Sequence, residues 1–148
     1  MPTRDHTITA QSKNYRYSVT VQVMIDADTR LVVAVGDPQV GNRNDPIAYQ
    51  ASGVDKTATG AHVMADGAYR GPNCPGVIIP HRRPGDCSEL PEWKQDHNTS
   101  HRRVRARVEH VFARMKNWKI LRDCRRRGTG VTHAAHGIAL MHNIALAG

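Results

Sequence analysis

The first third of the chain alternates between hydrophobic and polar residues. Residues 17–25 (YSVTVQVMI) show this alternation and are rich in β-branched side chains, which predicts a strand. Turn-forming residues follow at positions 26–29, and residues 30–35 (RLVVAV) form a second apolar stretch. We therefore predict a β-hairpin over residues 17–35.

Proline, glycine and asparagine then interrupt this pattern. Asn44 or Asp45 stands just before a proline, where either residue can cap a short helix near residues 47–51. Two short apolar runs, residues 62–65 and 77–79, have the composition of buried strands. The middle of the chain thus predicts one short helix and two short strands.

Helical patterns dominate the last third. Residues 81–98 predict a surface loop with a short helix around residues 89–94, and a long basic helix is expected to begin near Ser100. The apolar residues of that helix have the spacing of a face that packs on a core: Val104, Val108, Val111, Phe112 and Met115. A last helix over residues 131–147 has a predicted packing side formed by Ile138, Met141, Ile144 and Ala145.

The order of these elements predicts an α/β fold. Two strands, a short helix, two more strands and two helices give a small mixed sheet with helices against it. The chain has 148 residues, the length of one domain. We therefore predict one domain over residues 1–148, in which residues 128–148 form a C-terminal packing helix.

Positive charge is concentrated in one segment. The formal net charge is +8, and residues 101–127 contain 11 of the 21 lysines and arginines. This clustering predicts binding to a polyanion and favours nucleic acid over a membrane surface. No apolar run reaches the roughly 20 residues of a membrane span, and the three cysteines form no paired motif typical of a disulfide framework or a zinc site. We expect a cytoplasmic protein that binds no membrane.

One acidic residue, Glu109, lies inside the basic helix. Arg105, Glu109 and Lys116 fall on nearly the same side, because steps of four and of eleven residues both return to within about 40° of the start. A carboxylate between two cations can hold a metal ion beside a phosphate. The alternative is a solvent-exposed face on which Arg105 and Glu109 form an ordinary ion pair.

Asp66 is the second acidic residue of interest. It follows the apolar run 62–65, at the carboxyl end of a predicted strand, where open α/β sheets tend to bind ligands. The alternative is that Asp66 and Gly67 form an ordinary turn. A metal site shared by Asp66 and Glu109 would require the fold to bring them together.

Three segments, 64–71 (MADGAYRG), 77–83 (VIIPHRR) and 101–123 (HRRVRARVEHVFARMKNWKILRD), resemble the second half of bacterial insertion-sequence DDE transposases. The catalytic core of that family has a ribonuclease-H-like fold. Residues 15–45 resemble its second and third strands and the loop after them, so the best-matched region is 15–127. The resemblance implies a ribonuclease-H-like mixed sheet flanked by helices and incomplete at its N-terminus.

The resemblance also implies roles for individual residues. Asp66 matches the second catalytic acid of the family and Glu109 the third, and both are expected to bind Mg²⁺ or Mn²⁺. Arg105 and Lys116 match the family's spacing of arginine, three residues, glutamate, six residues and lysine. Arg102 stands where the family often has a tyrosine.

The first catalytic aspartate of the family lies on a strand before the hairpin, so we expect this chain to begin after it. Five aspartates could substitute for it: Asp5, Asp26, Asp28, Asp37 and Asp45. Asp26 and Asp28 fit a hairpin turn better than a metal site. Asp45 is the best placed of the five, as an auxiliary residue near the cleft.

The function implied by the resemblance is DNA transposition, with metal-dependent phosphodiester hydrolysis and strand transfer at transposon ends. The residues expected to contact the DNA are Arg102, Arg103, Arg105, Arg107 and Lys116. We expect a truncated, catalytically impaired transposase associated with the bacterial nucleoid. The alternative is a non-enzymatic DNA-binding module derived from a transposase. A missing strand supplied by another copy would give a homodimer or a higher oligomer.

Overall fold

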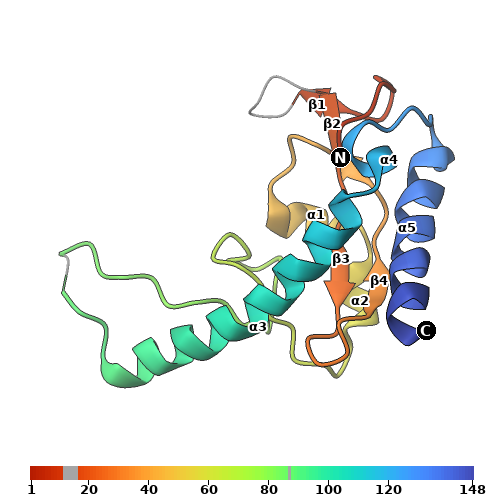
Figure 1. Cartoon of the computed structure of the whole chain (residues 1–148). Coiled ribbons are helices and arrows are strands. Elements are labelled where there is room, and N and C mark those ends of the chain that lie inside the picture. Colours follow the sequence, from red (N-terminus) through yellow and green to blue (C-terminus); the bar gives the residue numbers. More distant parts are fainter. Residues whose placement is uncertain (12–16, 87) are drawn as a thin grey trace.

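Two small antiparallel sheets form the centre of the molecule in the computed structural model, which describes residues 1–11, 17–86 and 88–148 (Figure 1). The first sheet has the order β1-β2-β5, with β1 at Ala10–Gln11, β2 at Tyr17–Thr20 and β5 at Gln39–Val40. The second sheet pairs β3 (Val23–Ile25) with β4 (Val32–Val35).

The strand predicted over residues 17–25 is divided between the two sheets. The part before residue 21 pairs with β5, and the part after residue 22 pairs with β4. Between the two parts Gln22 is buried, and its C=O accepts the N–H of Gly36 at 2.8 Å. The alternating pattern therefore predicts the extended backbone correctly but misses the change of partner strand, which depends on contacts distant in the sequence.

The predicted hairpin between β3 and β4 is confirmed. The Asp26 N–H donates to the C=O of Leu31 at 2.9 Å, and the Arg30 N–H donates to the C=O of Asp26 at 2.8 Å. Arg30 has a φ of 63°, in the left-handed region that tight turns use. The second strand begins at Val32, two residues later than predicted.

Asn44, one of the two predicted caps, begins helix α1 (Asp45–Ala51). Its side chain accepts the N–H of Ile47 at 3.2 Å. Pro46 lies in the first turn, where a missing N–H leaves no hydrogen bond unmade. Helix α2 (Val54–Thr57) follows after a short turn.

The two apolar runs predicted as strands form a single parallel bridge between Met64 and Ile78. The Ala65 N–H donates to the C=O of Ile78 at 3.0 Å, and the Ile78 N–H donates to the C=O of Val63 at 2.8 Å. Full strands are therefore a wrong prediction here. Pro80, which cannot donate to a ladder, stands two residues after Ile78, the one residue of the second run in this bridge.

Helix α3 (Glu92–Lys116) begins earlier than predicted and is continuous. Pro91 precedes it, and the predicted cap Ser100 lies exposed in its interior. No glycine or proline stands between the two ends, so nothing stops the helix from joining the predicted short helix to the long one. Its N-terminal half projects from the body of the molecule, and α4 (Lys119–Arg122) follows its C-terminus (Figure 1).

The C-terminal half of α3 packs on the core. Val111 and Met115 are 1% and 4% exposed. They cluster with residues of β4 and of the last helix, namely Val32, Ile138 and Ala139. The other members of the predicted face are half-buried and line a cavity: Val104, Val108 and Phe112. The predicted spacing is confirmed, but only the last turn and a half of the face reaches the core.

Helix α5 (Thr129–Ala147) is rotated relative to the prediction. Ile138 is buried as expected, but Met141 and Ile144 are 46% and 62% exposed, and Ala145 is also exposed. Hydrogen bonds of a polar side chain explain this rotation. The Asn143 side chain accepts the Val32 N–H at 2.8 Å and donates to the Val32 C=O at 2.9 Å. Pairing these backbone groups of β4 turns Asn143 inward and the apolar residues outward.

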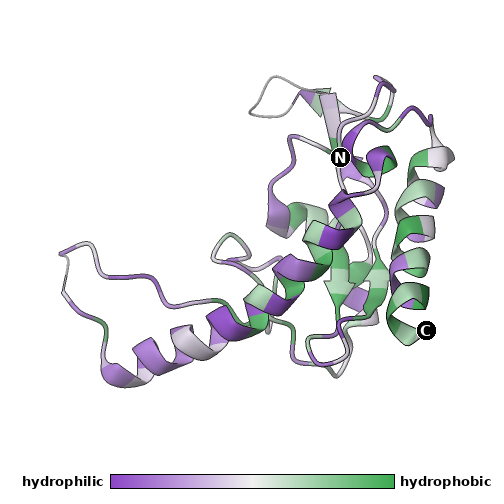
Figure 2. Cartoon of the chain, in the orientation of Figure 1, coloured by the Kyte–Doolittle hydropathy of each residue, from purple (hydrophilic) through white to green (hydrophobic). Residues whose placement is uncertain are grey.

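The α/β class is confirmed, since small sheets and helices pack together. The described strand ladders are all antiparallel, and the parallel pairings are isolated bridges. Figure 2 shows apolar residues gathered on β3, β4 and α5, whereas the projecting start of α3 is hydrophilic. Within the described residues, no helix is both long and apolar enough to cross a membrane.

The packing of α3 predicts a contrast between two methionines. Met115→Ala removes a side chain that is 4% exposed, and we expect the free energy of unfolding to fall by about 2–5 kcal/mol. Met141→Ala changes a helical methionine that is 46% exposed, and should cost less than about 0.5 kcal/mol. Urea unfolding followed by circular dichroism measures both. Equal losses would contradict the described core.

Candidate functional site

A cavity of about 760 Å³ lies between the β3 hairpin, the segment that carries Asp66 and helix α3. Consecutive residues 20–28 line one side and residues 61–66 another. Because neighbouring residues of a strand point to opposite faces, an unbroken run along the lining means that the cavity borders backbone as well as side chains. Five of the acidic residues named from the sequence line this cavity: Asp26, Asp28, Asp45, Asp66 and Glu109.

Asp66 is half-buried, forms the turn that was the alternative from the sequence, and also lines the cavity. It follows directly on the bridge between Met64 and Ile78. Its carboxylate Oδ1 accepts the N–H of Ala68 at 2.8 Å, and its C=O accepts the N–H of Tyr69 at 3.2 Å. The turn is therefore present, and it fixes one carboxylate oxygen of a residue that faces the cavity.

Glu109 forms the ion pair that was the simpler alternative from the sequence. Its Oε1 lies 2.8 Å from Nε of Arg105, and the side chains are 61% and 49% exposed, respectively. An exposed pair one helical turn apart contributes about 0.2–0.5 kcal/mol. Because this ion pair is weak, little free energy is needed to separate the Glu109 carboxylate from Arg105 and leave it able to bind a cation.

Tyr69 joins the turn of Asp66 to the sheet. Its hydroxyl donates to Oε1 of Gln22 at 2.7 Å. Burial, followed by the charge of Asp45 and then that of Asp66, raises the pKa of Tyr69 to about 12, even though the Gln22 hydrogen bond acts in the opposite direction. The phenol therefore stays protonated at neutral pH. Both carboxylates lie close enough to its ring to be felt electrostatically.

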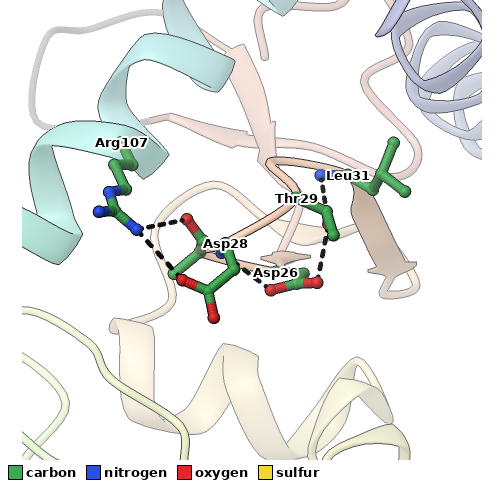
Figure 3. A network of polar contacts seen from close by, with 6 residues as sticks. Asp26, Asp28, Thr29, Leu31 and Arg107 are labelled. Atoms are coloured by element: carbon green, nitrogen blue, oxygen red, sulfur yellow. Dashed lines mark hydrogen bonds and ion pairs between the residues drawn. The ribbon is translucent and has the colours of Figure 1, made fainter. Parts of the chain in front are cut away.

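Two of the substitute aspartates hold the hairpin turn (Figure 3). The Asp26 carboxylate accepts the N–H of Asp28 at 3.0 Å and the hydroxyl of Thr29 at 2.7 Å. The Arg107 guanidinium lies 3.2 Å from Oδ1 of Asp28 and donates to the C=O of Ala27 at 3.3 Å. Both aspartates border the cavity, but these contacts fit the turn role expected for them.

The remaining substitutes differ in their positions. Asp37 is exposed and does not line the cavity. Asp5 is buried, and its carboxylate accepts the N–H groups of Thr7 at 3.0 Å and Gly128 at 2.7 Å. Asp5 therefore holds the start of α5, whereas Asp45 lies in the first turn of α1 and lines the cavity.

The predicted DNA-contacting residues separate into groups. Arg105 lines the cavity beside Glu109, and Arg107 is tied to the hairpin. Arg102 donates to the Thr99 hydroxyl at 3.1 Å, and Arg103 is exposed. Lys116 does not line the cavity but lies near the N-terminal amine, whose pKa is lowered by burial and then by the Lys116 charge. The fold thus brings Arg105, but not Lys116, to the acidic residues.

The donor chemistry of the cavity fits a hard divalent cation, because carboxylate oxygens are the ligands that Mg²⁺ prefers. Asp66 and Glu109 are the residues that would hold it, the first from the segment after the Met64–Ile78 bridge and the second from helix α3. Within residues 1–11, 17–86 and 88–148, no three histidine, cysteine, aspartate or glutamate side chains converge on one point where a metal could bind. The described residues therefore show no complete set of metal ligands.

His101 lines the cavity and was not predicted from the sequence. His101 is 3% exposed, and its Nε2 lies 2.8 Å from the C=O of Ala65, the residue before Asp66. The available signal was its position three residues before Val104, on the apolar side of a basic helix. A single histidine on such a face gave no indication of its partner.

A known protein family and a known protein resemble this chain along nearly all of its length. The family described as "Transposase DDE domain" matches residues 1–144. The chain belongs to this DDE transposase family. The protein named "Putative transposase for insertion sequence element IS112", from Streptomyces albus G, is 61% identical over 148 residues. The match covers 100% of this chain and 57% of the relative. No solved structure matches the chain.

Family membership confirms the resemblance found in the sequence. DDE transposase domains generally use divalent metal ions, which agrees with the carboxylates that line the cavity.

The contacts of Asp5 predict a pH-dependent stability. Hydrogen bonds from the Thr7 hydroxyl, and then from the Gly128 and Thr7 N–H groups, lower the pKa of Asp5. Its contribution is therefore complete above the unfolded value of about 3.9 and is lost as pH falls through the lower folded value. We expect Asp5→Asn to be destabilising at pH 6 and this destabilisation to shrink as the pH falls below the unfolded value.

Urea unfolding of both proteins across this pH range measures the difference. Asp37→Asn, an exposed substitution of the same kind, corrects for the change in net charge. A difference between wild type and Asp5→Asn that stays constant down to pH 2.5 would show that the carboxylate charge does not hold α5.

Proposed function

We propose that this chain forms part of the catalytic domain of an insertion-sequence DDE transposase and that Asp66 and Glu109 hold Mg²⁺ or Mn²⁺ beside bound DNA. One observation carries the proposal: Asp66 and Glu109, which are far apart in the sequence, line the same cavity, and Asp45 lines it too. The matching family and the relative's name support transposition as the reaction.

The metal would supply the activation of a nucleophile and the stabilisation of the leaving oxygen during in-line attack on a phosphodiester. Residues of the chain would orient the metal ligands and contact the DNA. The Ala68 N–H fixes one Asp66 oxygen, which leaves the carboxylate oriented toward the cavity. Because the exposed ion pair is weak, the Arg105 side chain can leave Glu109 and pair with a DNA phosphate instead.

The ribonuclease-H-like fold belongs to the same proposal. Among the described strands, β3 pairs with β4 alone, and the cavity runs along residues 20–28 and 61–66. A strand edge without a partner invites a further strand. We propose that the strand bearing the family's first aspartate lies here. The Streptomyces albus G relative, of which this chain covers 57%, has further residues that could include such a strand. The alternative is that a second copy of this chain supplies the strand, and light scattering would then show an oligomer.

A second candidate is a DNA-binding module without catalysis. The observation that favours it is the Arg105–Glu109 ion pair, which neutralises one of the two carboxylates in the absence of DNA. In this case Asp66 serves the turn alone, and the basic helix binds phosphates by charge. Metal binding separates the two candidates.

We expect the 148-residue chain to bind Mn²⁺ and Asp66→Asn and Glu109→Gln each to weaken this binding by about tenfold or more, since loss of even an outer-shell partner of a metal ligand costs 10–100-fold. Isothermal titration calorimetry measures the affinity, and nicking of supercoiled plasmid in Mn²⁺ reports any cleavage. Asp37→Asn, exposed and outside the cavity, is the matched control. Unchanged affinity in both site variants would leave the DNA-binding module as the function.

The basic helix predicts a salt-dependent affinity for DNA. Each lost phosphate contact lowers the slope of log affinity against log salt by about 0.9, so Arg102→Ala with Arg103→Ala should lower it by about 1.8. The matched variant, in which both arginines become lysine, keeps the charge and should keep the slope. Fluorescence anisotropy of a labelled duplex at several KCl concentrations measures it. An alanine variant with the wild-type slope would exclude these two residues from the DNA contact.

A further inference from the structure

His101 is buried in a stretch of α3 that is otherwise largely exposed. Its side chain is 3% exposed, whereas Ser100, Arg102 and Arg103 around it are exposed. It borders the cavity from the helix side, two turns before Glu109. A polar ring in this position needs a hydrogen-bond partner to offset the cost of burial.

The partner of His101 is the peptide group that leads into Asp66. Nε2 lies 2.8 Å from the C=O of Ala65. A carbonyl oxygen only accepts hydrogen bonds, so Nε2 must carry the proton. The N–H of Ala65 donates in turn to the C=O of Ile78 at 3.0 Å. The backbone before Asp66 is therefore held from both sides, by the helix and by the parallel bridge.

Glu109 lies on the same helix as His101. Eight residues of α-helix span about 12 Å, and the backbone hydrogen bonds make this length nearly constant. The hydrogen bond at Ala65 thus fixes the position of α3 along its own axis relative to Asp66. Because Glu109 lies on the same helix and lines the same cavity, its position relative to Asp66 follows from this contact.

A second tie holds the same turn of α3 independently. The Asn98 side chain donates to the C=O of His81 at 3.0 Å and accepts its N–H at 2.8 Å. The His97 ring packs against those of His81 and His101, with centroids 4.8 Å and 6.4 Å apart. These contacts keep the helix attached when the His101 hydrogen bond is removed, so a substitution there should still fold.

We infer that His101 is a positioning residue for the metal site: its hydrogen bond to Ala65 sets the separation of the Asp66 and Glu109 carboxylates. This inference rests on the proposed function, because it assigns a task to a bond between the two walls of that site. His101 touches neither the metal nor DNA in this assignment. It acts through the backbone of Ala65 and through the helix.

The test uses the full 148-residue chain and Mn²⁺ as the probe. His101→Leu removes the donor, and we expect the Mn²⁺ affinity measured by calorimetry to fall 10–100-fold, the range for residues that orient metal ligands. His101→Gln keeps an amide N–H near the place of Nε2 and should retain the wild-type affinity to within about threefold. His110→Leu, an exposed histidine of the same helix, should leave it unchanged.

A readout without metal accompanies the titration. The N–H of Ala68 donates to Asp66 Oδ1, so hydrogen exchange at this amide reports whether the turn holds its shape. We expect faster exchange in His101→Leu and wild-type exchange in His101→Gln. Should His101→Leu fail to fold, His101→Asn replaces it. The asparagine amide is too short to reach Ala65, so the same losses are expected.

The outcomes separate this inference from the function on which it rests. If Asp66→Asn binds Mn²⁺ as tightly as wild type, the metal site itself is wrong. If Asp66→Asn and Glu109→Gln weaken binding while a folded His101→Leu or His101→Asn binds normally, the site stands and the positioning role is overturned. A purely structural histidine would lower the melting temperature and leave the Mn²⁺ affinity of the folded chain unchanged.

Discussion

Helix α3 packs its last turns on the core through Val111 and Met115, and the position of every candidate site residue on the helix depends on this contact. Burying two such side chains stabilises the fold by several kcal/mol, far more than the exposed ion pairs on the same helix. The apolar contact therefore decides where the helix lies. Glu109 and Arg105 are carried to the cavity by the helix and do not themselves determine its path.

Polar ties then refine this arrangement at three places. Asn143 pairs both backbone groups of Val32 and sets the rotation of α5. His101 binds the C=O of Ala65, and Asn98 binds both backbone groups of His81. In each case a helical side chain satisfies backbone groups of an extended segment. Such segments are too short here to satisfy one another in long ladders.

The charged residues of the site form exposed ion pairs that a bound ligand can separate. Glu109 is paired with Arg105, and Asp28 with Arg107, and all four side chains are well exposed. Exposed pairs of this kind contribute little to stability. A bound polyanion could attract both arginines at small cost to the fold, and the carboxylates would then become available to a cation. Binding of DNA and binding of metal would in this way favour each other.

The sequence predicts what depends on local chemistry. The hairpin, the Asn44 cap, the turn at Asp66 and the spacing of the α3 face follow from residue types over a few positions, and the structure confirms them. The resemblance to the transposase family is confirmed as well. These features need no knowledge of distant contacts.

Other features depend on contacts between distant segments, and the sequence missed them. The strand over residues 17–25 changes partner at Gln22, and α5 turns its Met141 outward because Asn143 is held by β4. Helix α3 begins earlier than predicted because the prolines and the glycine that indicate a loop over residues 81–98 all stand before Glu92, and the polar residues after Pro91 belong to the helix. The role of His101 could not be seen, since its partner is a backbone carbonyl that no residue type reveals.

The central claim is that Asp66 and Glu109 share one divalent ion. Anomalous X-ray scattering from crystals of the 148-residue chain grown with Mn²⁺ tests it most directly. The account predicts one strong peak within about 2.5 Å of a carboxylate oxygen from each of the two residues, the range for hard cations bound to oxygen ligands. A peak held by other residues, or crystals in which Glu109 keeps Arg105 and no manganese lies beside Asp66, would contradict it.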